Sequence, residues 1–497
     1  MNDSDRPITS QTEARIERAR WLALVGLCAG MLIIILDQTI VNVALPSIQR
    51  DLHFTQANLA WVVNAYLIAF GGLLLLAGRV GDLVGRKRVF MIGLTVFTVA
   101  SVVCGLSDSQ GMLIGARFIQ GIGGALTSSV ILGMIVTMFP GGEERGRAIG
   151  IYSFVAAAGA SLGLLLGGVL TQAINWHWIF FVNVPIAVLT ATLVVRLLER
   201  DEGLGLRHGA DVPGAVLVTG ALMLGVYAVV EASRYHWGSA HTLGVGGVAL
   251  ALLVAFLARQ AYARQPLMPL RILRAPNVAA ANLIQVLMVA GLLGMFFLGA
   301  LYMQQVLHYD AVEVGLAFLP VALSIAVFSV RFSAVLTARF GPRSALTGAL
   351  LLIAVGLGLF SRVPVDANYV TSLLPVMLLL GVGAGIAFPA LMTLAMSGAT
   401  PQDSGLASGL VNTTQQVGGA IGLALLASLS TTRTNHLLGL GDATSVARVG
   451  GYHLAFAIAA GLVVVGIVVA ATGLRPVAVV EPAVEAEPPE VWQAEAA

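Results

Sequence analysis

Long apolar stretches alternate with short polar segments along almost the whole chain. A helix that crosses a hydrocarbon core of about 30 Å needs about 20 consecutive, mostly apolar residues. By this measure the sequence contains fourteen candidate spans, and it predicts an all-α membrane protein. The spans lie at about 21–45, 57–77, 89–106, 111–139, 148–171, 179–198, 212–232, 243–262, 277–307, 311–338, 344–360, 370–394, 406–430 and 452–474.

The order of the spans, six, two and six, is typical of a duplicated six-helix unit with a helical hairpin inserted between the copies. We therefore predict five regions along the chain. They are a cytoplasmic segment (1–20), a first bundle (21–198), an inserted hairpin with its loops (199–276), a second bundle (277–474) and a tail (475–497). The tail is acidic and rich in proline, which predicts disorder.

Basic residues are distributed unequally between the two sets of loops. With the amino terminus in the cytoplasm, the positive-inside rule is satisfied and an even number of spans places both termini there. No small-residue cleavage site follows the first apolar run, so we expect a retained span in the plasma (inner) membrane. The residues on the predicted cytoplasmic side are Arg6, Arg15, Arg18, Arg20, Arg79, Arg86, Lys87, Arg88, Arg259, Arg264, Arg271 and Arg274.

Composition narrows the possible functions. The chain is 58% hydrophobic and 10% charged, and its net charge of +2 is too small to indicate a nucleic-acid partner. Lys87 lies between two arginines and is not followed by Ser or Thr, so it forms no ATP-binding P-loop. Cys28 and Cys104 lie in separate apolar runs, which indicates packing residues and neither a disulfide nor a metal site. We expect no enzymatic activity, no metal and no cofactor.

One carboxylate stands inside the first span. The segment LDQTIVNVALPSI (36–48) places Asp37, Gln38 and Asn42 on a polar sector about 140° wide, which can face a water-filled cavity. Arg117 lies in the fourth span, about as far from the outer end as Asp37. A charge in a span needs a partner or water. We therefore predict that Asp37 and Arg117 form a pair; the alternatives are a static structural pair and an Arg117 that snorkels to the surface.

Four motifs accompany this pair. They are GRVGDLVGRKR (78–88), LIGARFIQGIGGA (113–125), the glycines of the fifth span, and SGLVNTTQQVGGAIG (408–422). Together with LDQTIVNVALPSI they resemble the major facilitator superfamily, and within it the fourteen-helix branch of drug:proton antiporters. The resemblance covers nearly the whole chain and implies two pseudo-symmetric six-helix bundles around a central cavity.

The resemblance implies roles for these motifs. Asp37 and Arg117 would couple proton movement to transport. Gly78, Asp82, Gly85, Arg86 and Lys87 would form a gating loop, although the basic residues alone also fit a simple positive-inside anchor. The glycines on the fifth span would allow close helix packing; the family has proline where this chain has Leu164. These glycines are Gly150, Gly159, Gly163, Gly167 and Gly168.

Several polar residues in the spans are candidates to line a substrate cavity. For those in the thirteenth span, hydrogen bonds between helices are an equal alternative. His177 belongs to an aromatic segment, NWHWIFFVNVP (175–185), which we interpret as an interfacial belt and not as a proton carrier. The cavity candidates are Gln38, Asn42, Asn64, Tyr66, Tyr152, Gln304, Asn412, Gln415 and Gln416.

The expected function is export of amphipathic, drug-like molecules in exchange for protons, with both competing for Asp37. The proton gradient would supply the energy, and the partners would be a small organic substrate, protons and lipid. We expect a monomer. A dedicated exporter of one metabolite, self-made antibiotic or lipid is the alternative on the same fold. A membrane-embedded enzyme or sensor is disfavoured because no catalytic motif or sizeable soluble domain is found.

Overall fold

The computed structural model describes residues 10–139, 142–198, 203, 205, 211–263, 266–267, 270–271, 274–397 and 404–475. These residues form helices and connecting loops, with no strand among them. The segment predicted to be a disordered tail lies, from residue 476 onward, outside the described residues, as do residues 1–9.

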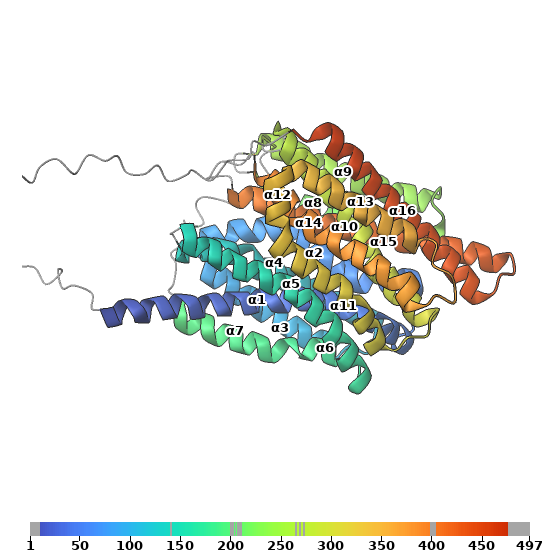
Figure 1. The fold of residues 1–497 in the computed structure, drawn as a ribbon, viewed down its shortest axis with the longest axis horizontal. Helices are drawn as coiled ribbons and strands as arrows, with labels where there is room; N and C mark the ends of the chain where they lie inside the picture. Colours follow the sequence, from blue (N-terminus) through green and yellow to red (C-terminus); the bar gives the residue numbers. More distant parts are fainter. Residues whose placement is uncertain are drawn as a thin grey trace, which may run out of the picture.

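The helices fall into three consecutive sets (Figure 1). We call α1–α7 the first helix group and α10–α16 the second helix group. The first group comprises α1 (Ser10–Asp51), α2 (Gln56–Val84), α3 (Arg86–Gly105), α4 (Gln110–Met138), α5 (Gly142–Ala173), α6 (Trp178–Phe181) and α7 (Asn183–Leu197). The helices α8 (Val212–Tyr235) and α9 (Ala240–Tyr262) follow. The second group comprises α10 (Pro276–Gln305), α11 (Ala311–Val327), η3 (Phe328–Phe332), α12 (Ser333–Phe340), α13 (Pro342–Phe360), η4 (Tyr369–Leu373), α14 (Leu374–Met396), α15 (Ser404–Gly439) and α16 (Thr444–Gly473).

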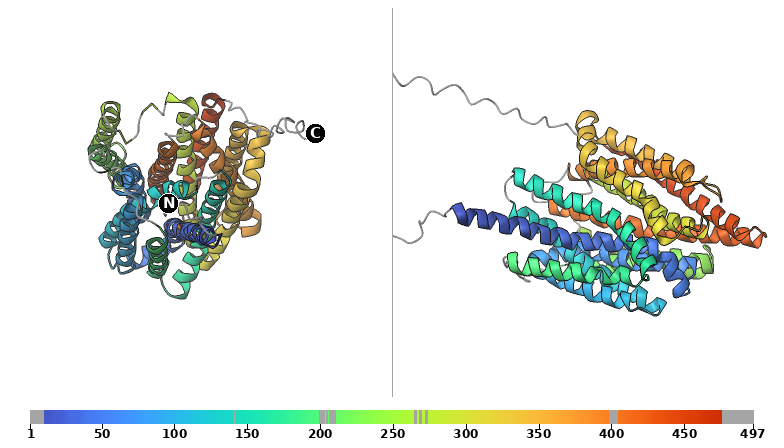
Figure 2. Two further views of the ribbon diagram at one scale, coloured as in Figure 1. Left: turned by 90° about the vertical axis from the view of Figure 1, so that its left-hand side faces the viewer. Right: turned by 60° about the horizontal axis from the view of Figure 1, so that its bottom comes forward.

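The long helices run side by side, and the two groups lie next to each other. In the end-on view of Figure 2, the blue helices of the first group and the yellow-to-orange helices of the second lie on opposite sides. We call the end of the bundle at which α1 begins the terminal end, on the left in Figure 1. We call the other the distal end; it carries the loops around His53, Asp108 and Asn175.

Most of these helices are long and apolar enough to cross a membrane. Eleven satisfy both requirements among the described residues, and the bent pair Asn58–Leu74 and Leu76–Val84 of α2 makes a twelfth. The helices α5 and α15 occupy two further positions in the bundle, and the part of each that the structure describes does not meet both requirements. The chain is therefore an all-α, multi-pass membrane protein. The count of fourteen spans is consistent with this arrangement and stays a prediction.

Three predicted spans divide into more than one element in the structure, and one of them, 370–394, begins with the π-helical turn η4 before α14. The predicted helix 311–338 contains the π-helical turn η3, so it divides into α11 and α12. The predicted helix 179–198 divides into α6 and α7. Pro185 explains this break, because a residue without an N–H group fits the first turn of a helix and not its interior.

Contacts between the two groups include hydrogen bonds close to the distal end. Gln304 of α10 donates to the carbonyl oxygen of Val43 on α1 at 2.9 Å. Next to it, Gln305 donates to Gln49 at 2.8 Å. Elsewhere at this end α5 packs on α11, and α2 packs on α15 deeper in the bundle. These contacts hold the distal ends of the two groups together in this conformation.

The inserted pair lies on one side of this arrangement. α8 packs on both α2 and α15, and so contacts one helix from each group, whereas α9 packs on α8. α9 exposes apolar side chains such as Leu250 and Val254, as expected of a helix surrounded by lipid. Asp211, the N-cap of α8, joins the pair by accepting a 2.5 Å hydrogen bond from Nε of Arg259 on α9.

Candidate functional site

The centre of the first helix group contains a buried ion pair. Nη1 of Arg117 on α4 lies 2.5 Å from Oδ2 of Asp37 on α1, and their side chains are 1% and 0% exposed. Removing two charges from water is costly, so such a pair persists only with good geometry and further hydrogen bonds. The structure thus brings together the two charges that the sequence placed at matching depth.

Three polar side chains from other helices complete the site around Asp37. Nε2 of Gln120 donates to Oδ1 of Asp37 at 2.8 Å, and Nδ2 of Asn183 donates to the same atom at 3.2 Å. Both amides also contact Oγ of Ser101, at 2.6 and 3.3 Å. α1, α3, α4 and α7 each contribute a side chain to this network, so the carboxylate position depends on all four helices.

The guanidinium of Arg117 is held equally tightly. Its Nε donates to the carbonyl oxygen of Val62 on α2 at 2.9 Å, and its Nη1 donates to Oε1 of Gln120 at 2.7 Å. Its Cζ lies 4.5 Å from the ring centre of Tyr66 and 5.8 Å from that of Phe180. Aromatic faces stabilise a cation by their quadrupole. Arg117 therefore does not snorkel to the surface in this structure.

Asp37 lies on the face of α1 that points into the first group. Its contacts come from α4 and α7, and Ser101 of α3 contacts the two amides that donate to it. Another face of α1 packs elsewhere: Thr39 lies against Gly163 of α5, and the carbonyl oxygen of Val43 accepts from α10. With no exposed surface, Asp37 is closed to a bound organic molecule in this conformation. Direct competition between substrate and proton at Asp37 stays a prediction.

The residues predicted to line a cavity occupy several environments. In the first group, Asn42 donates from Nδ2 to the carbonyl oxygen of Gln38, and Asn64 is 0% exposed with neither side-chain polar atom hydrogen-bonded within the described structure. Tyr66 is buried against Arg117, and Tyr152 is partly buried. A role for these residues in lining a substrate cavity stays a prediction.

The predicted cavity residues of the second group are also dispersed. Gln304 belongs to the distal contact with α1, Asn412 is exposed and Gln415 is partly buried. Gln416 is 8% exposed and lies against Gly71 of α2, in the contact between the two groups. Gln416 thus has the position expected of a residue between the groups, whereas a role in binding substrate stays a prediction.

The predicted gating residues form a compact cluster at the turn between α2 and α3. Gly85 has φ of 107°, which only glycine adopts without strain, and this permits the sharp turn. Oδ1 of Asp82 accepts from Nε and Nη2 of Arg86 at 3.2 and 3.0 Å. Nη1 of Arg86 also reaches α4, where it donates to the carbonyl oxygen of Gly133 at 3.1 Å. Gly78 is partly buried one turn before Asp82.

Lys87 connects the same turn to α7. Its Nζ donates to the carbonyl oxygens of Val195 and Leu198, at the end of that helix. Cations stabilise the unpaired carbonyls of a helix C-terminus. The cluster therefore links the terminal ends of α2, α3, α4 and α7.

The glycines of α5 lie where another backbone comes very close. A Cβ atom on Gly163 would lie 2.9 Å from the carbonyl oxygen of Leu36 on α1, and one on Gly167 would lie 2.7 Å from that of Ile40. Gly168 faces α11 in the same way, and Gly159 packs on Leu32 less tightly. Gly150 lies in α5, outside the part of the helix whose contacts are described. α5 is one continuous helix through Leu164, which replaces the family proline.

The polar shell around the ion pair was not among the predicted site residues. Gln120 lies three residues after Arg117, inside a motif already singled out, so the helical repeat alone indicates that both side chains share one face. Ser101 and Asn183 carry no comparable signal, because a single small polar residue in an apolar span is common. Cys104, predicted to be a packing residue, is 0% exposed, and its Sγ lies 3.6 Å from Oε1 of Gln120.

Known proteins resemble this chain along most of its length. The family model described as Major Facilitator Superfamily matches residues 27–423. The puromycin resistance protein pur8 of Streptomyces alboniger is 39% identical over 470 residues, 93% of each chain. The cephamycin export protein CmcT of Amycolatopsis lactamdurans is 38% identical over 416 residues, 83% of this chain and 85% of that one.

A solved structure agrees with this at the level of the fold. The crystal structure of an auto-inhibited peptide transporter of the POT family has a TM-score of 0.67 and 15% sequence identity, and the match covers 94% of this chain and 99% of the other. Identity this low shows the fold alone. The family match and the identity to full-length transport and resistance proteins go further. They show that the chain belongs to the Major Facilitator Superfamily.

Proposed function

We propose that this protein is a secondary exporter that moves amphipathic, drug-like molecules out of the cell in exchange for protons. The observation that carries the proposal is the buried pair of Asp37 and Arg117, at 2.5 Å and with almost no exposure. A charge pair this deep in an apolar bundle is costly and marks a proton or ion relay by default. The named relatives, a puromycin resistance protein and a cephamycin export protein, support antibiotic-like substrates.

Asp37 is the proton carrier in this mechanism. When its carboxylate is ionised, Arg117, Gln120 and Asn183 hold it by charge and hydrogen bonds. Protonation weakens the attraction to Arg117 and loosens the contacts between α1, α4 and α7. Substrate binding would favour the state in which the proton has left. The proton gradient is then the only energy source, and no cofactor takes part.

Two six-helix units, 21–198 and 277–474, would alternate between the two sides of the membrane. The distal contacts through Gln304 and Gly168 would open, and the turn around Asp82 would form contacts across the terminal end. The protein lies in the plasma membrane in this proposal. Its terminal end faces the cytoplasm, because the arginine-rich loops lie at that end. We expect the protein to act as a monomer. A carboxyl-terminal reporter active only outside the cell would contradict this orientation.

Growth of a pump-deficient host expressing the chain, across a panel that includes puromycin and a cephamycin, identifies the substrates. Protection against several unrelated compounds would support a multidrug exporter. Protection against one compound alone would favour a dedicated exporter of a self-made antibiotic, the alternative on the same fold.

Proton coupling is tested with purified protein in weak buffer containing a pH dye. Substrate should release protons from the wild type and not from Asp37→Asn, which keeps the size of the side chain but does not titrate. Asp366→Asn is the matched control, because Asp366 is an exposed carboxylate in the loop before η4. Equal release from the wild type and Asp37→Asn would make Asp37 a structural partner of Arg117 only.

A further inference from the structure

A buried polar stripe runs along α3 from the ion pair toward the distal end. We call Ser101, Cys104 and Ser107 the α3 stripe. Ser101 and Cys104 are three residues apart in α3, so they occupy neighbouring positions on the helix surface. Ser107 follows in the loop just after Leu106, the C-cap of α3. Their exposed fractions are 0%, 0% and 1%. Three buried polar groups in one line are unusual in a span that is otherwise apolar, and they need a physical reason.

The inner end of the stripe is bonded to the groups that hold Asp37. Oγ of Ser101 accepts from the amides of Gln120 and Asn183, and both amides also donate to Asp37. Cys104 is next, with its Sγ 3.6 Å from Oε1 of Gln120. Oδ1 of Asn183 is buried and has no hydrogen-bond partner among the described residues, so it can still accept one.

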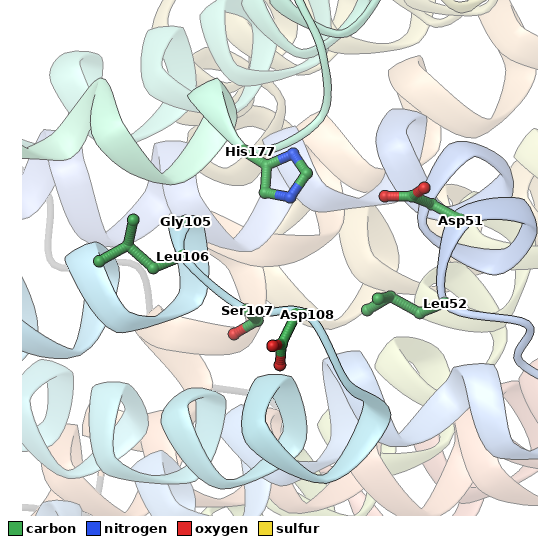
Figure 3. Close-up of a pocket in the computed structure, with 7 residues that line it drawn as sticks. All are labelled: Asp51, Leu52, Gly105, Leu106, Ser107, Asp108 and His177. Atoms are coloured by element: carbon green, nitrogen blue, oxygen red, sulfur yellow. The ribbon is translucent and has the colours of Figure 1, made fainter.

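The outer end of the stripe reaches a pocket at the distal surface, which we call the distal pocket (Figure 3). Its volume is about 410 Å³, and it is lined by Asp51, Leu52, Gly105, Leu106, Ser107, Asp108 and His177. In the close-up the two carboxylates and the imidazole surround one opening. Oδ2 of Asp51 accepts from the indole of Trp176 at 2.8 Å, and His177 stacks on that indole with ring centres 3.8 Å apart.

The surroundings of this line belong to the first helix group. α3 packs on α2, α4, α6 and α7. The titratable or charged side chains that face the line are Asp51, Asp108 and His177 at the pocket, Cys104 on α3, and Tyr66 and Arg117 at Asp37. The contact between the two groups is made by other helices, such as α5 with α11 and α2 with α15.

We propose that protons reach Asp37 from the distal side through the distal pocket and along the α3 stripe, separately from the substrate. This inference rests on the proposed function, in which Asp37 carries the proton. Carboxylates and imidazole bind protons at the pocket, and a serine hydroxyl both donates and accepts, so it can pass a proton to water or a neighbour. The amides of Gln120 and Asn183 keep the receiving carboxylate aligned.

A separate route changes how coupling works. Substrate would occupy the space between the two groups, whereas the proton would arrive from within one of them. The two would then exclude each other through the positions of α1 and α4 and not by occupying the same atoms. The burial of Asp37, with no surface open toward the second group, fits this arrangement.

The test uses the full chain in proteoliposomes with a pH dye inside and puromycin as the transported probe. Ser107→Leu fills the outer end of the stripe without touching the contact between the groups. We expect it to slow puromycin-driven proton movement by about tenfold, as when one donor and acceptor is removed from a relay. Exchange of labelled for unlabelled puromycin needs no net proton movement, and we expect it to stay within about twofold of the wild type.

Two further variants distinguish an effect on the proton route from misfolding of the protein. Ser107→Ala removes the outer hydroxyl without adding bulk and without touching the network around Asp37, and it should also slow proton movement and spare puromycin exchange. Thr95→Val is the matched control: its hydroxyl donates to the carbonyl oxygen of Met91 on an exposed face of α3, away from the stripe. It should leave both rates unchanged. If Ser107→Leu loses puromycin exchange as well, the rates of Ser107→Ala decide whether the route is supported.

The outcomes separate the two proposals. Wild-type rates of proton movement in both serine variants, together with none in Asp37→Asn, would show that protons enter through the space between the groups, and the route proposed here would be wrong. No proton movement in the wild type, despite puromycin exchange, would overturn the proposed function itself. Slowed proton movement with intact exchange supports the route.

Discussion

Gly168 of α5 lies so close to α11 that a Cβ atom added to it would be 2.5 Å from the carbonyl oxygen of Ala311. Next to this contact, Nε2 of Gln172 donates to Oδ2 of Asp310 at 3.0 Å. α5 also packs on α1 through Gly163 and Gly167. One helix with small residues on two faces therefore holds the distal ends of both helix groups together.

Gly168→Ala should weaken this distal contact. A methyl group has no room beside the backbone of Ala311, and overpacking of this kind costs about 1–3 kcal/mol. In a background of Cys28→Ser and Cys104→Ser, cysteines at Gln172 and Asp310 report the contact by oxidative crosslinking. We expect slower crosslinking with Gly168→Ala. Gly115→Ala on α4, where an added Cβ meets nothing within 4 Å, is the matched control; equal rates in both would mean that α5 and α11 tolerate the methyl group.

Arg117→Ala should lower the stability of the protein strongly. It leaves the carboxylate of Asp37 buried without its cation, and breaking a buried pair from one side costs about 3–5 kcal/mol. Replacing both residues by leucine should cost less than Arg117→Ala alone, because no charge then remains in the bundle. Chemical denaturation in detergent measures both values. Additive losses would show that the two side chains do not stabilise each other.

Asp82→Asn should reduce transport and leave the folded protein and substrate binding largely intact. The carboxylate is 40% exposed, and its partner Arg86 keeps hydrogen bonds to Gly133 and Thr137 without it, so stability should change by less than about 1 kcal/mol. The loss should appear in the rate at which the two states interconvert. Equilibrium binding and transport rate are measured on the same preparation. Unchanged transport would leave the turn as a topological anchor.

Asp211 should make the free energy of unfolding depend on pH in the acidic range. Burial raises the pKa of its carboxyl, but hydrogen bonds from Arg259, Gln260 and the backbone N–H of Gly214 outweigh this and lower it below the usual value. A lowered pKa in the folded state adds stability above the unfolded pKa of about 3.9, and this stability is lost as the pH falls through the folded value. The inserted pair should therefore loosen below about pH 4.

The matching variant is Asp211→Asn. Asparagine still caps α8 but lacks the negative charge that Arg259 contacts, so stability at pH 7 should fall by about 0.2–1 kcal/mol and its dependence on acid should flatten. Thermal unfolding in detergent at pH 7 and at about pH 3 measures both effects. An unchanged acid profile would mean that Asp211 titrates alike in the folded and unfolded chain.

The lengths of the apolar stretches in the sequence made most of the fold predictable. Most of the helices coincide with predicted spans to within several residues, because a span needs a long apolar run whatever its surroundings. The number fourteen is harder to establish at α5 and α15, whose glycines and polar residues dilute the apolar signal. The break at η3 was not predictable, since no proline or glycine marks residues 328–332.

The site was predictable where charge or spacing gave a signal. Depth alone placed Asp37 beside Arg117, because a rise of about 1.5 Å per residue fixes height along a helix. The direction in which a side chain points around the helix axis is harder to predict than its height along the axis. α3 and α7 carry single Ser, Thr and Asn residues among apolar ones, so the sequence does not indicate that Ser101 and Asn183 turn toward Asp37 and not toward lipid. The expectation that Asp37 faces a shared cavity stays a prediction.

The position of Asp37 on α1 also bears on how such a protein adapts to new antibiotics. Asp37 contacts α4 and α7, whereas Thr39 and Val43, on the same helix, meet α5 and α10. Under the proposed mechanism, substitutions on the second face would change the surface that meets α5 and α10 and leave the contacts of Asp37 unchanged. A lineage under selection by a changing set of toxins could then vary residues on that face while the proton-carrying residues stay fixed.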